Sequence, residues 1–297
     1  MHSQKRAYLY AFSAVLIWST IATALTMTLR VMDKTGMLFW AFLVSFVVLA
    51  IITFFTGKFG AWKAYICKYW KRTLLLGTIN PFIYYITLFY AYDLLPAQEA
   101  QAINYTWALM LAYLSVPLLG HRLSKWDVLA GLICYLGVVI IATHGNIFSL
   151  AFSNLTGVGI ALLSTVFWAL YWILITKHKE DTVVVLLSNF SVGVLWMGLY
   201  VLYADVSLTT YTSFALWGAV YIGLFEMGVT FVLWGRALIL TERTSTISNL
   251  IFLSPILSLF FIHFVAGERI YFSTVIALVL ILFGLFLQQR MNDKIQQ

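Results

Sequence analysis

Ten long apolar runs follow one another along the chain, and short polar segments separate them. The runs cover residues 7–29, 37–56, 73–92, 95–118, 126–143, 156–176, 183–203, 213–235, 245–265 and 271–289. A helix needs about 20 apolar residues to cross the hydrocarbon core of a bilayer. The pattern therefore predicts an all-α integral membrane protein with ten transmembrane helices joined by short loops.

The composition supports the same prediction. Of the 297 residues, 62% are apolar and only 10% are charged, whereas a soluble domain averages about 45–50% apolar and about 25% charged residues. One compact water-soluble body cannot bury such an excess of apolar side chains. A soluble enzyme and a disordered chain are therefore excluded.

The basic residues predict how the chain is oriented. If the N-terminus is cytoplasmic, fifteen of the eighteen Lys and Arg residues fall in cytoplasmic segments, and only Arg30, Lys34 and Arg269 fall outside. Short cytoplasmic loops carry such an excess of basic residues. We expect both termini in the cytoplasm and the chain in a bacterial-type inner membrane. The basic residues form no continuous stripe, so nucleic acid is not an expected partner.

The two halves of the chain resemble each other. The segment 11–18 (AFSAVLIW) matches 161–168 (ALLSTVFW), 119–123 (LGHRL) matches 266–270 (AGERI), and Gly137 matches Gly284. These matches divide the chain into two five-helix repeats, residues 1–145 and 150–297. An odd number of helices per repeat inverts the second repeat in the membrane, an architecture typical of alternating-access transporters.

Glu226 is the most conspicuous polar residue inside an apolar run. Its counterpart in the first repeat is Asn80, which is followed by Pro81. An ionisable side chain in a membrane span is costly and often functional. Glu226 and Asn80 are therefore predicted to face a central cavity, where Glu226 would bind a substrate amine or a proton. The alternative is a carboxyl group held between helices for structural reasons.

The fourth run begins with an unusually polar segment. Gln98, Glu99 and Gln101 lie in its first turns, and Asn104 lies deeper. We expect this helix beside a water-filled cavity, with Glu99 at the outer mouth and Asn104 in the binding site. An interfacial helix end would also tolerate such residues.

Aromatic residues make up 17% of the chain. Several lie deep in the runs that carry the polar groups, and they would suit solutes with planar or cationic parts. The predicted binding-site aromatics are Tyr84, Tyr105, Trp107, Trp168, Tyr171, Trp18 and Trp234, with Tyr85 beside them. Packing between helices is an equally good explanation for any single one.

Known catalytic, metal-binding and nucleotide-binding motifs do not occur in the sequence. The two cysteines, Cys67 and Cys134, lack metal-ligand spacing, and His263 has no partner at helical spacing. We therefore expect no enzyme activity, cofactor or metal. A small-molecule substrate and the lipid bilayer are the expected partners.

Short motifs along the whole chain resemble the EamA branch of the drug/metabolite transporter superfamily, and within it the aromatic amino acid exporters. The similar segments are 16–20 (LIWST), Glu99 with 104–107 (NYTW), 168–171 (WALY) with Lys177, and Trp234 with 254–255 (SP). Ala108 stands where that group has proline, and Thr106 where it has leucine. The resemblance implies ten helices in two inverted repeats and export of neutral, often aromatic, amino acids without ATP.

Other functions remain open at this point. A multidrug or cationic-metabolite exporter of the same fold is the nearest alternative. A non-transporting membrane sensor or structural subunit is the alternative from another class. Protons are a further candidate partner of the transport step.

Overall fold

The structure is a computed structural model that describes residues 2–120, 125–148, 154–176, 180–241 and 249–295. In these ranges the ordered elements are all helical, as predicted. The first part of the chain contains α1 (His2–Leu29), α2 (Lys34–Phe55), α3 (Phe59–Gly77), η1 (Thr78–Ile83), α4 (Tyr84–Leu94), α5 (Ala97–Asn104), α6 (Trp107–Leu119) and α7 (Lys125–Ala142). The second part contains α8 (Leu155–Thr176), α9 (Thr182–Tyr203), α10 (Ser213–Ile222), η2 (Gly223–Gly228), α11 (Val229–Leu240), η3 (Asn249–Phe252), α13 (Leu253–Phe264) and α14 (Phe272–Ile295).

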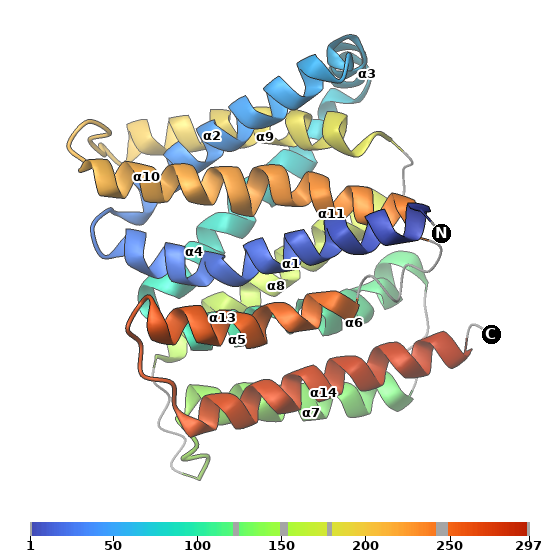
Figure 1. The fold of residues 1–297 in the computed structure, drawn as a ribbon, viewed down its shortest axis with the longest axis vertical. Helices are drawn as coiled ribbons and strands as arrows, with labels where there is room; N and C mark the ends of the chain where they lie inside the picture. Colours follow the sequence, from blue (N-terminus) through green and yellow to red (C-terminus); the bar gives the residue numbers. More distant parts are fainter. Residues whose placement is uncertain (1, 121–124, 149–153, 177–179, 242–248, 296–297) are drawn as a thin grey trace.

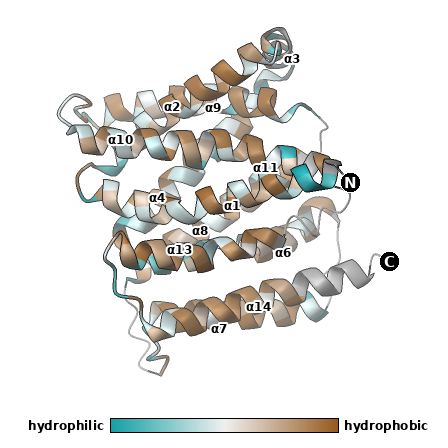
Figure 2. Ribbon diagram, in the orientation of Figure 1, coloured by the Kyte–Doolittle hydropathy of each residue, from teal (hydrophilic) through white to brown (hydrophobic). Residues whose placement is uncertain are grey.

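Eight helical segments are long and apolar enough to cross a membrane, and two shorter apolar helices, Leu253–Phe264 and Phe272–Leu287, follow them. Figure 2 shows apolar residues along the lengths of the helices, with polar residues at the N-terminal end of α1 and in several turns. This distribution fits a multi-pass membrane protein, because lipid surrounds the middle of each helix and water its ends.

Helices that are distant in the sequence pack side by side (Figure 1). The helix α2 packs on α9, α1 packs on α11 and α13, and α8 packs on α4 and α6. The helices α7 and α14 form an extensive pair at one end of the molecule. The first and second parts of the chain are thus interleaved, and most contacts between helices join one part to the other.

One expected helix boundary is wrong. The basic segment before Thr73, expected as a loop, is helical from Phe59 onward, with a local kink at Tyr69. Its apolar and polar residues alternate with helical spacing, and the many lysines in it concealed that pattern. The fourth run agrees with one apolar span, Ala97–Leu119, which is interrupted by a short turn between the end of α5 at Asn104 and the start of α6 at Trp107.

Two of the long helical segments contain an irregular turn. The π-helix η1 interrupts the third segment, where Asn80 has an extended backbone (φ −141°, ψ 118°) before a cis bond to Pro81. The π-helix η2 interrupts the eighth predicted span. Proline explains the first break, since it lacks the N–H group that a helix interior requires. Both breaks lie within protein contacts, where irregular backbone is tolerated at membrane depth.

Glycines allow α7 and α14 to approach closely. A Cβ atom at Gly137 would lie 2.9 Å from the carbonyl oxygen of Ala277, and a Cβ atom at Gly284 would lie 3.0 Å from that of Ala130. The Sγ of Cys134 bonds the carbonyl oxygen of Ile281 at 3.3 Å in the same contact. Small residues at such crossings let helix backbones touch, which is the main source of helix association in lipid.

A methyl group at Gly284 should therefore separate the two helices. We expect Gly284→Ala to lower the free energy of unfolding by about 1–3 kcal/mol, because the new Cβ would lie 2.5 Å from the Cys134 Sγ. The matched control is Gly159→Ala in α8, where no heavy atom lies within 4 Å of the new Cβ and stability should rise by about 0.5–1 kcal/mol. Unfolding of both variants in detergent micelles measures the difference. Equal stability of the two would contradict this account of the contact.

Candidate functional site

Glu226 lies on the π-helix η2 and is half-buried. Its Oε1 accepts a hydrogen bond of 3.2 Å from the hydroxyl of Tyr85 on α4. Its backbone carbonyl oxygen accepts a bond of 3.5 Å from the Trp18 indole N–H on α1. Within the described residues, no basic side chain forms an ion pair with Glu226. The carboxyl group therefore has one hydroxyl donor and capacity for further donors.

Most of the predicted binding-site aromatics form one cluster around Trp168. The ring centroid of Trp168 lies 4.5 Å from that of Tyr84, 6.3 Å from that of Trp107 and 6.3 Å from that of Tyr171. Phe231 lies 5.8 Å from Trp168 and joins it to Trp18 and Trp234. These rings come from α1, α4, α6, α8 and α11, so both parts of the chain contribute to the cluster.

Several members of this central set retain accessible surface although they belong to the inner contacts of the bundle. Trp18, Trp107, Trp168 and Glu226 are half-buried rather than buried, as is Tyr105 in the turn between α5 and α6, while Tyr84 and Tyr85 are almost fully buried. Well-packed interiors leave little surface accessible. The half-buried side chains therefore keep some surface that a small molecule can contact, whereas Tyr84 and Tyr85 are enclosed by protein.

The two predicted asparagines have different surroundings. Asn80 on η1 is 4% exposed, and its Oδ1 has no hydrogen-bond partner among the described residues. Asn104, at the end of α5, donates a bond of 3.0 Å from its Nδ2 to the Ser164 hydroxyl on α8. Asn80 and Glu226 each lie on a helix break, η1 and η2 respectively.

The polar start of α5 is packed against the turn between α13 and α14. Gln98 is buried, and it bonds the Arg269 carbonyl oxygen at 3.0 Å and the Thr274 hydroxyl at 2.7 Å. Glu99 is also buried, and its Oε1 lies 3.6 Å from Nδ1 of the more exposed His144. Glu99 thus lies at this end of the bundle, away from the aromatic cluster, with its carboxylate directed to the α7–α8 turn.

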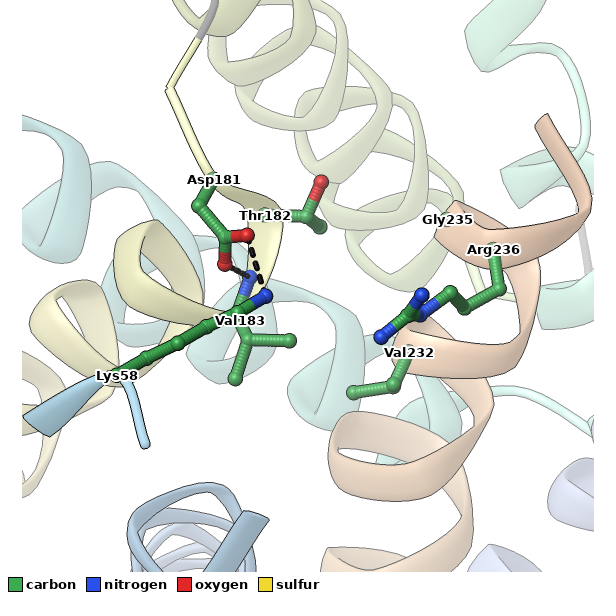
Figure 3. A pocket seen from close by; sticks show the side chains of 7 residues that line it. All are labelled: Lys58, Asp181, Thr182, Val183, Val232, Gly235 and Arg236. Atoms are coloured by element: carbon green, nitrogen blue, oxygen red, sulfur yellow. Dashed lines mark hydrogen bonds and ion pairs between the residues drawn. The ribbon is translucent and has the colours of Figure 1, made fainter. Parts of the chain in front are cut away.

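A pocket opens at the other end of the bundle, where α3 and α9 begin and α11 approaches its end (Figure 3). It has about 360 Å³ of empty space, open solvent included. Lys58 bonds Asp181 at 2.6 Å on one side, and Arg236 extends toward this pair from the opposite side. The other lining residues are Thr182, Val183, Val232 and Gly235.

Asp181 also caps α9, since its Oδ1 accepts bonds from the N–H groups of Val183 and Val184. Burial acts to raise the pKa of this carboxyl group. The bonds to Lys58 and to the two N–H groups outweigh burial and hold the pKa below its usual value. Asp181 is therefore charged at neutral pH, and it joins the start of α9 to the start of α3.

Comparison with known proteins decides the family. The model of the EamA-like transporter family matches residues 5–143 and again residues 155–288. The chain belongs to the EamA-like transporter family. This membership confirms the resemblance to the EamA branch and the prediction of a transporter-type membrane protein rather than an enzyme.

Two further likenesses to this EamA-like chain agree with the family. An uncharacterized transporter in the sor 3′ region of Acidianus ambivalens is 27% identical over 177 residues, which are 58% of this chain and 66% of that protein. A solved crystal structure superposes with a TM-score of 0.70 at 21% identity, over 98% of this chain and 99% of the other. The second likeness shows a shared fold.

Some residues of the EamA-like chain's central cluster were not expected from the sequence. Tyr85 was grouped with the deep aromatics, but nothing in the sequence indicates that its hydroxyl binds Glu226. Ser164 and Phe231 occur in apolar runs where such residues are common. Asn189, which is buried and bonds the Tyr171 hydroxyl at 3.1 Å, carries the one available signal, a carboxamide inside an apolar run.

The Asp181 contacts predict a measurable difference between two substitutions in this EamA-like protein. Asp181→Ala removes the helix cap and should lower the free energy of unfolding by about 1 kcal/mol. Asp181→Asn keeps an acceptor for the cap and loses only a partly exposed ion pair, so its loss should be smaller. Unfolding of both variants at neutral pH in micelles measures the two losses.

The pH dependence provides a second check on Asp181. The pKa of the Asp181 carboxyl group is lower in the folded state than in the unfolded state. The excess in free energy of unfolding of wild type over Asp181→Asn is therefore complete above about pH 4. It should disappear as the pH falls through the folded-state pKa. If Asp181→Ala has the same free energy of unfolding as wild type at neutral pH, the Asp181 cap does not stabilise α9.

Proposed function

We propose that this protein is a ten-helix carrier that exports small amphiphilic metabolites, above all neutral and aromatic amino acids, by alternating access. The observation that carries the proposal is Glu226, a half-buried carboxyl group on a helix break that contacts Tyr85 and Trp18 beside the aromatic cluster. Both parts of the chain contribute those rings. A site between two bundles, near the middle of the membrane, is what alternating access requires.

Helices at corresponding positions of the two parts make corresponding contacts with the other part. This pattern supports two inverted five-helix repeats, residues 1–145 and 150–297. The first helix packs on the eighth and ninth spans (α11 and α13), and correspondingly α8 packs on the third and fourth spans (α4 and α6). Likewise α3 packs on α9, while η2 and α10 pack on α2. The double match of the family model agrees with this division. The two shorter apolar helices complete the ten spans.

The distribution of charged contacts supports the proposed orientation. Lys58 and Arg236, both assigned to the cytoplasm, line one pocket at the end of the bundle where α1 begins. Arg30 and Lys34, assigned to the outside, lie at the other end, where they bond the Ala266 carbonyl oxygen and Asp93. We infer that the protein lies in a bacterial-type inner membrane with both termini on the cytoplasmic side.

The substrate class follows from the chemistry of the central cluster. Aromatic rings offer apolar area and stack on planar groups. Glu226 can accept hydrogen bonds from a substrate ammonium group, and a charge-assisted bond of this kind is strong. An aromatic amino acid has both parts. Trp18, Asn80, Tyr84, Asn104, Tyr105, Trp107, Trp168, Tyr171, Glu226 and Trp234 are the proposed site residues, with Glu99 at the outer mouth.

A second candidate function has one observation in its favour. Glu226 has no ion-pair partner among the described residues, and the aromatic residues that contact it, Tyr85 and Trp18, offer ring faces for a cation. These groups would also suit an exporter of organic cations. Competition between phenylalanine and an aromatic cation for the same carrier separates the two functions.

The Glu226 carboxylate should be needed for transport of amino acids. We expect Glu226→Gln to lower kcat/KM for phenylalanine at least about tenfold, because one charge-assisted bond to the ammonium group is lost. Counterflow of labelled phenylalanine in proteoliposomes, with and without a pH gradient, measures the effect. The gradient arm also shows whether proton movement accompanies transport.

Asp205→Asn is the matched control for Glu226→Gln. It removes one negative charge from an exposed residue after α9 and should leave the counterflow rate unchanged. Wild-type kinetics in Glu226→Gln would overturn the role of this carboxylate. Failure of wild-type protein to move any of the twenty amino acids would overturn the substrate class.

A further inference from the structure

The helix α3 has a buried polar face that faces α8 and α9. Its lysines, Lys63, Lys68 and Lys71, are exposed, whereas Tyr65 is buried and Arg72 is half-buried. Tyr65 packs with Val184 and Val185 of α9. Arg72 thus differs from the neighbouring lysines, because the fold turns it toward the protein.

The polar atoms on this face lack partners. The Nη1 of Arg72, the hydroxyl of Tyr65 and the hydroxyl of Thr73 are all buried and have no hydrogen bond within the described part of the chain. Tyr65 is 5% exposed and Thr73 is 3% exposed. A buried polar group without a partner is unfavourable, and a buried unpaired charge is more so.

Two more polar residues border the same region. Asn189 on α9 is 0% exposed, and its Nδ2 bonds the Tyr171 hydroxyl while its Oδ1 has no partner among the described residues. The helix α3 packs on α9, which carries Asn189, and also contacts α8, which carries Tyr171. Arg72 and Tyr65 thus lie on the helix that packs against the helices of Asn189 and Tyr171.

These groups are mainly donors. Arg72 provides N–H groups only, and the hydroxyl protons of Tyr65 and Tyr171 are available, since Tyr171 accepts from Asn189. A cluster with one positive charge and several free donors calls for an anionic acceptor. Guanidinium binds a carboxylate through two parallel bonds, and this geometry is stronger and more specific than a lysine contact.

We infer that Arg72, with the hydroxyls of Tyr65 and Tyr171, forms a carboxylate-binding site between α3, α8 and α9, in which Asn189 orients the Tyr171 hydroxyl. It would hold the carboxylate of an amino acid on its path from the cytoplasm, and this role rests on the proposed function. The pocket at Lys58 and Asp181 lies at the starts of the same two helices, α3 and α9. The Tyr171 ring lies 6.3 Å from that of Trp168, so the site adjoins the aromatic cluster.

The experiment measures binding of 3-phenylpropionate, which has an aromatic ring and a carboxylate but no ammonium group. Full-length protein in nanodiscs of phosphatidylcholine avoids anionic lipid, and calorimetry gives the Kd. We expect Arg72→Gln to weaken binding at least about tenfold. Lys71→Gln, the matched control, removes one positive charge from the adjacent exposed residue and should leave the Kd unchanged.

Tyr65→Phe tests the site with a smaller change. It removes one hydroxyl without altering the packing of the ring, and it should weaken 3-phenylpropionate binding about threefold to tenfold. Phenethylamine, which lacks a carboxylate, should bind wild type and Arg72→Gln equally. A loss of phenethylamine binding equal to the loss of 3-phenylpropionate binding would show that Arg72 has only a structural role and would overturn the inference.

Other outcomes separate this inference from the proposed function. Unchanged 3-phenylpropionate binding in Arg72→Gln and Tyr65→Phe overturns the site, even if wild-type protein moves phenylalanine in counterflow. Binding that depends on Arg72 supports the site, even if no amino acid is transported. Binding of inorganic phosphate but not 3-phenylpropionate overturns the carboxylate assignment and indicates a phosphate or lipid-headgroup site.

Discussion

Direct contact between helix backbones from the first and second parts of the chain is the constraint on which this structure depends. Lipid provides no hydrophobic driving force between helices, so close packing has to hold them together. Glycine makes that contact possible at matched positions. A Cβ atom at Gly77 would lie 2.6 Å from the Asn189 carbonyl oxygen on α9, and one at Gly223 would collide with the Ala41 carbonyl oxygen on α2.

The same two glycines stand at the helix breaks. Gly77 precedes η1 and Gly223 begins η2, so the irregular turns lie against protein rather than lipid. At these positions neighbouring polar atoms can form hydrogen bonds with the backbone groups that the breaks leave unpaired. The Ser45 hydroxyl, for example, donates a bond of 2.8 Å to the Gly223 carbonyl oxygen. The breaks place Asn80 and Glu226 inside the bundle. In the proposed carrier, packing between the repeats and presentation of the polar site therefore depend on the same contacts.

Hydropathy and polar residues inside apolar runs are local signals, so the sequence was sufficient to predict the helical architecture. The same signals indicated the polar residues Asn80 and Glu226 on the third and eighth spans. They also indicated most aromatics of the central cluster. The sequence was not sufficient for α3, since lysine-rich segments also form loops, and so the inward orientation of Arg72 was hidden. It did not indicate that Tyr85 binds Glu226 or that Asn189 meets Tyr171. Such pairs join helices that are distant in the sequence, and they depend on tertiary packing, which no local pattern encodes.

The central claim is that the aromatic cluster beside Glu226 borders a substrate path that opens to each side of the membrane in turn. The most direct measurement uses a single cysteine at Tyr105, a half-buried residue, after Cys67 and Cys134 have been replaced by Ser and Ala. A membrane-impermeant maleimide is applied to the outside or the inside of oriented vesicles. The account predicts that Tyr105→Cys is labelled from both sides and that phenylalanine slows the reaction. If Tyr105→Cys is not labelled from the outside, or is not labelled from the inside, the result contradicts alternating access. Absence of labelling from both sides would indicate that side chains fill the cluster.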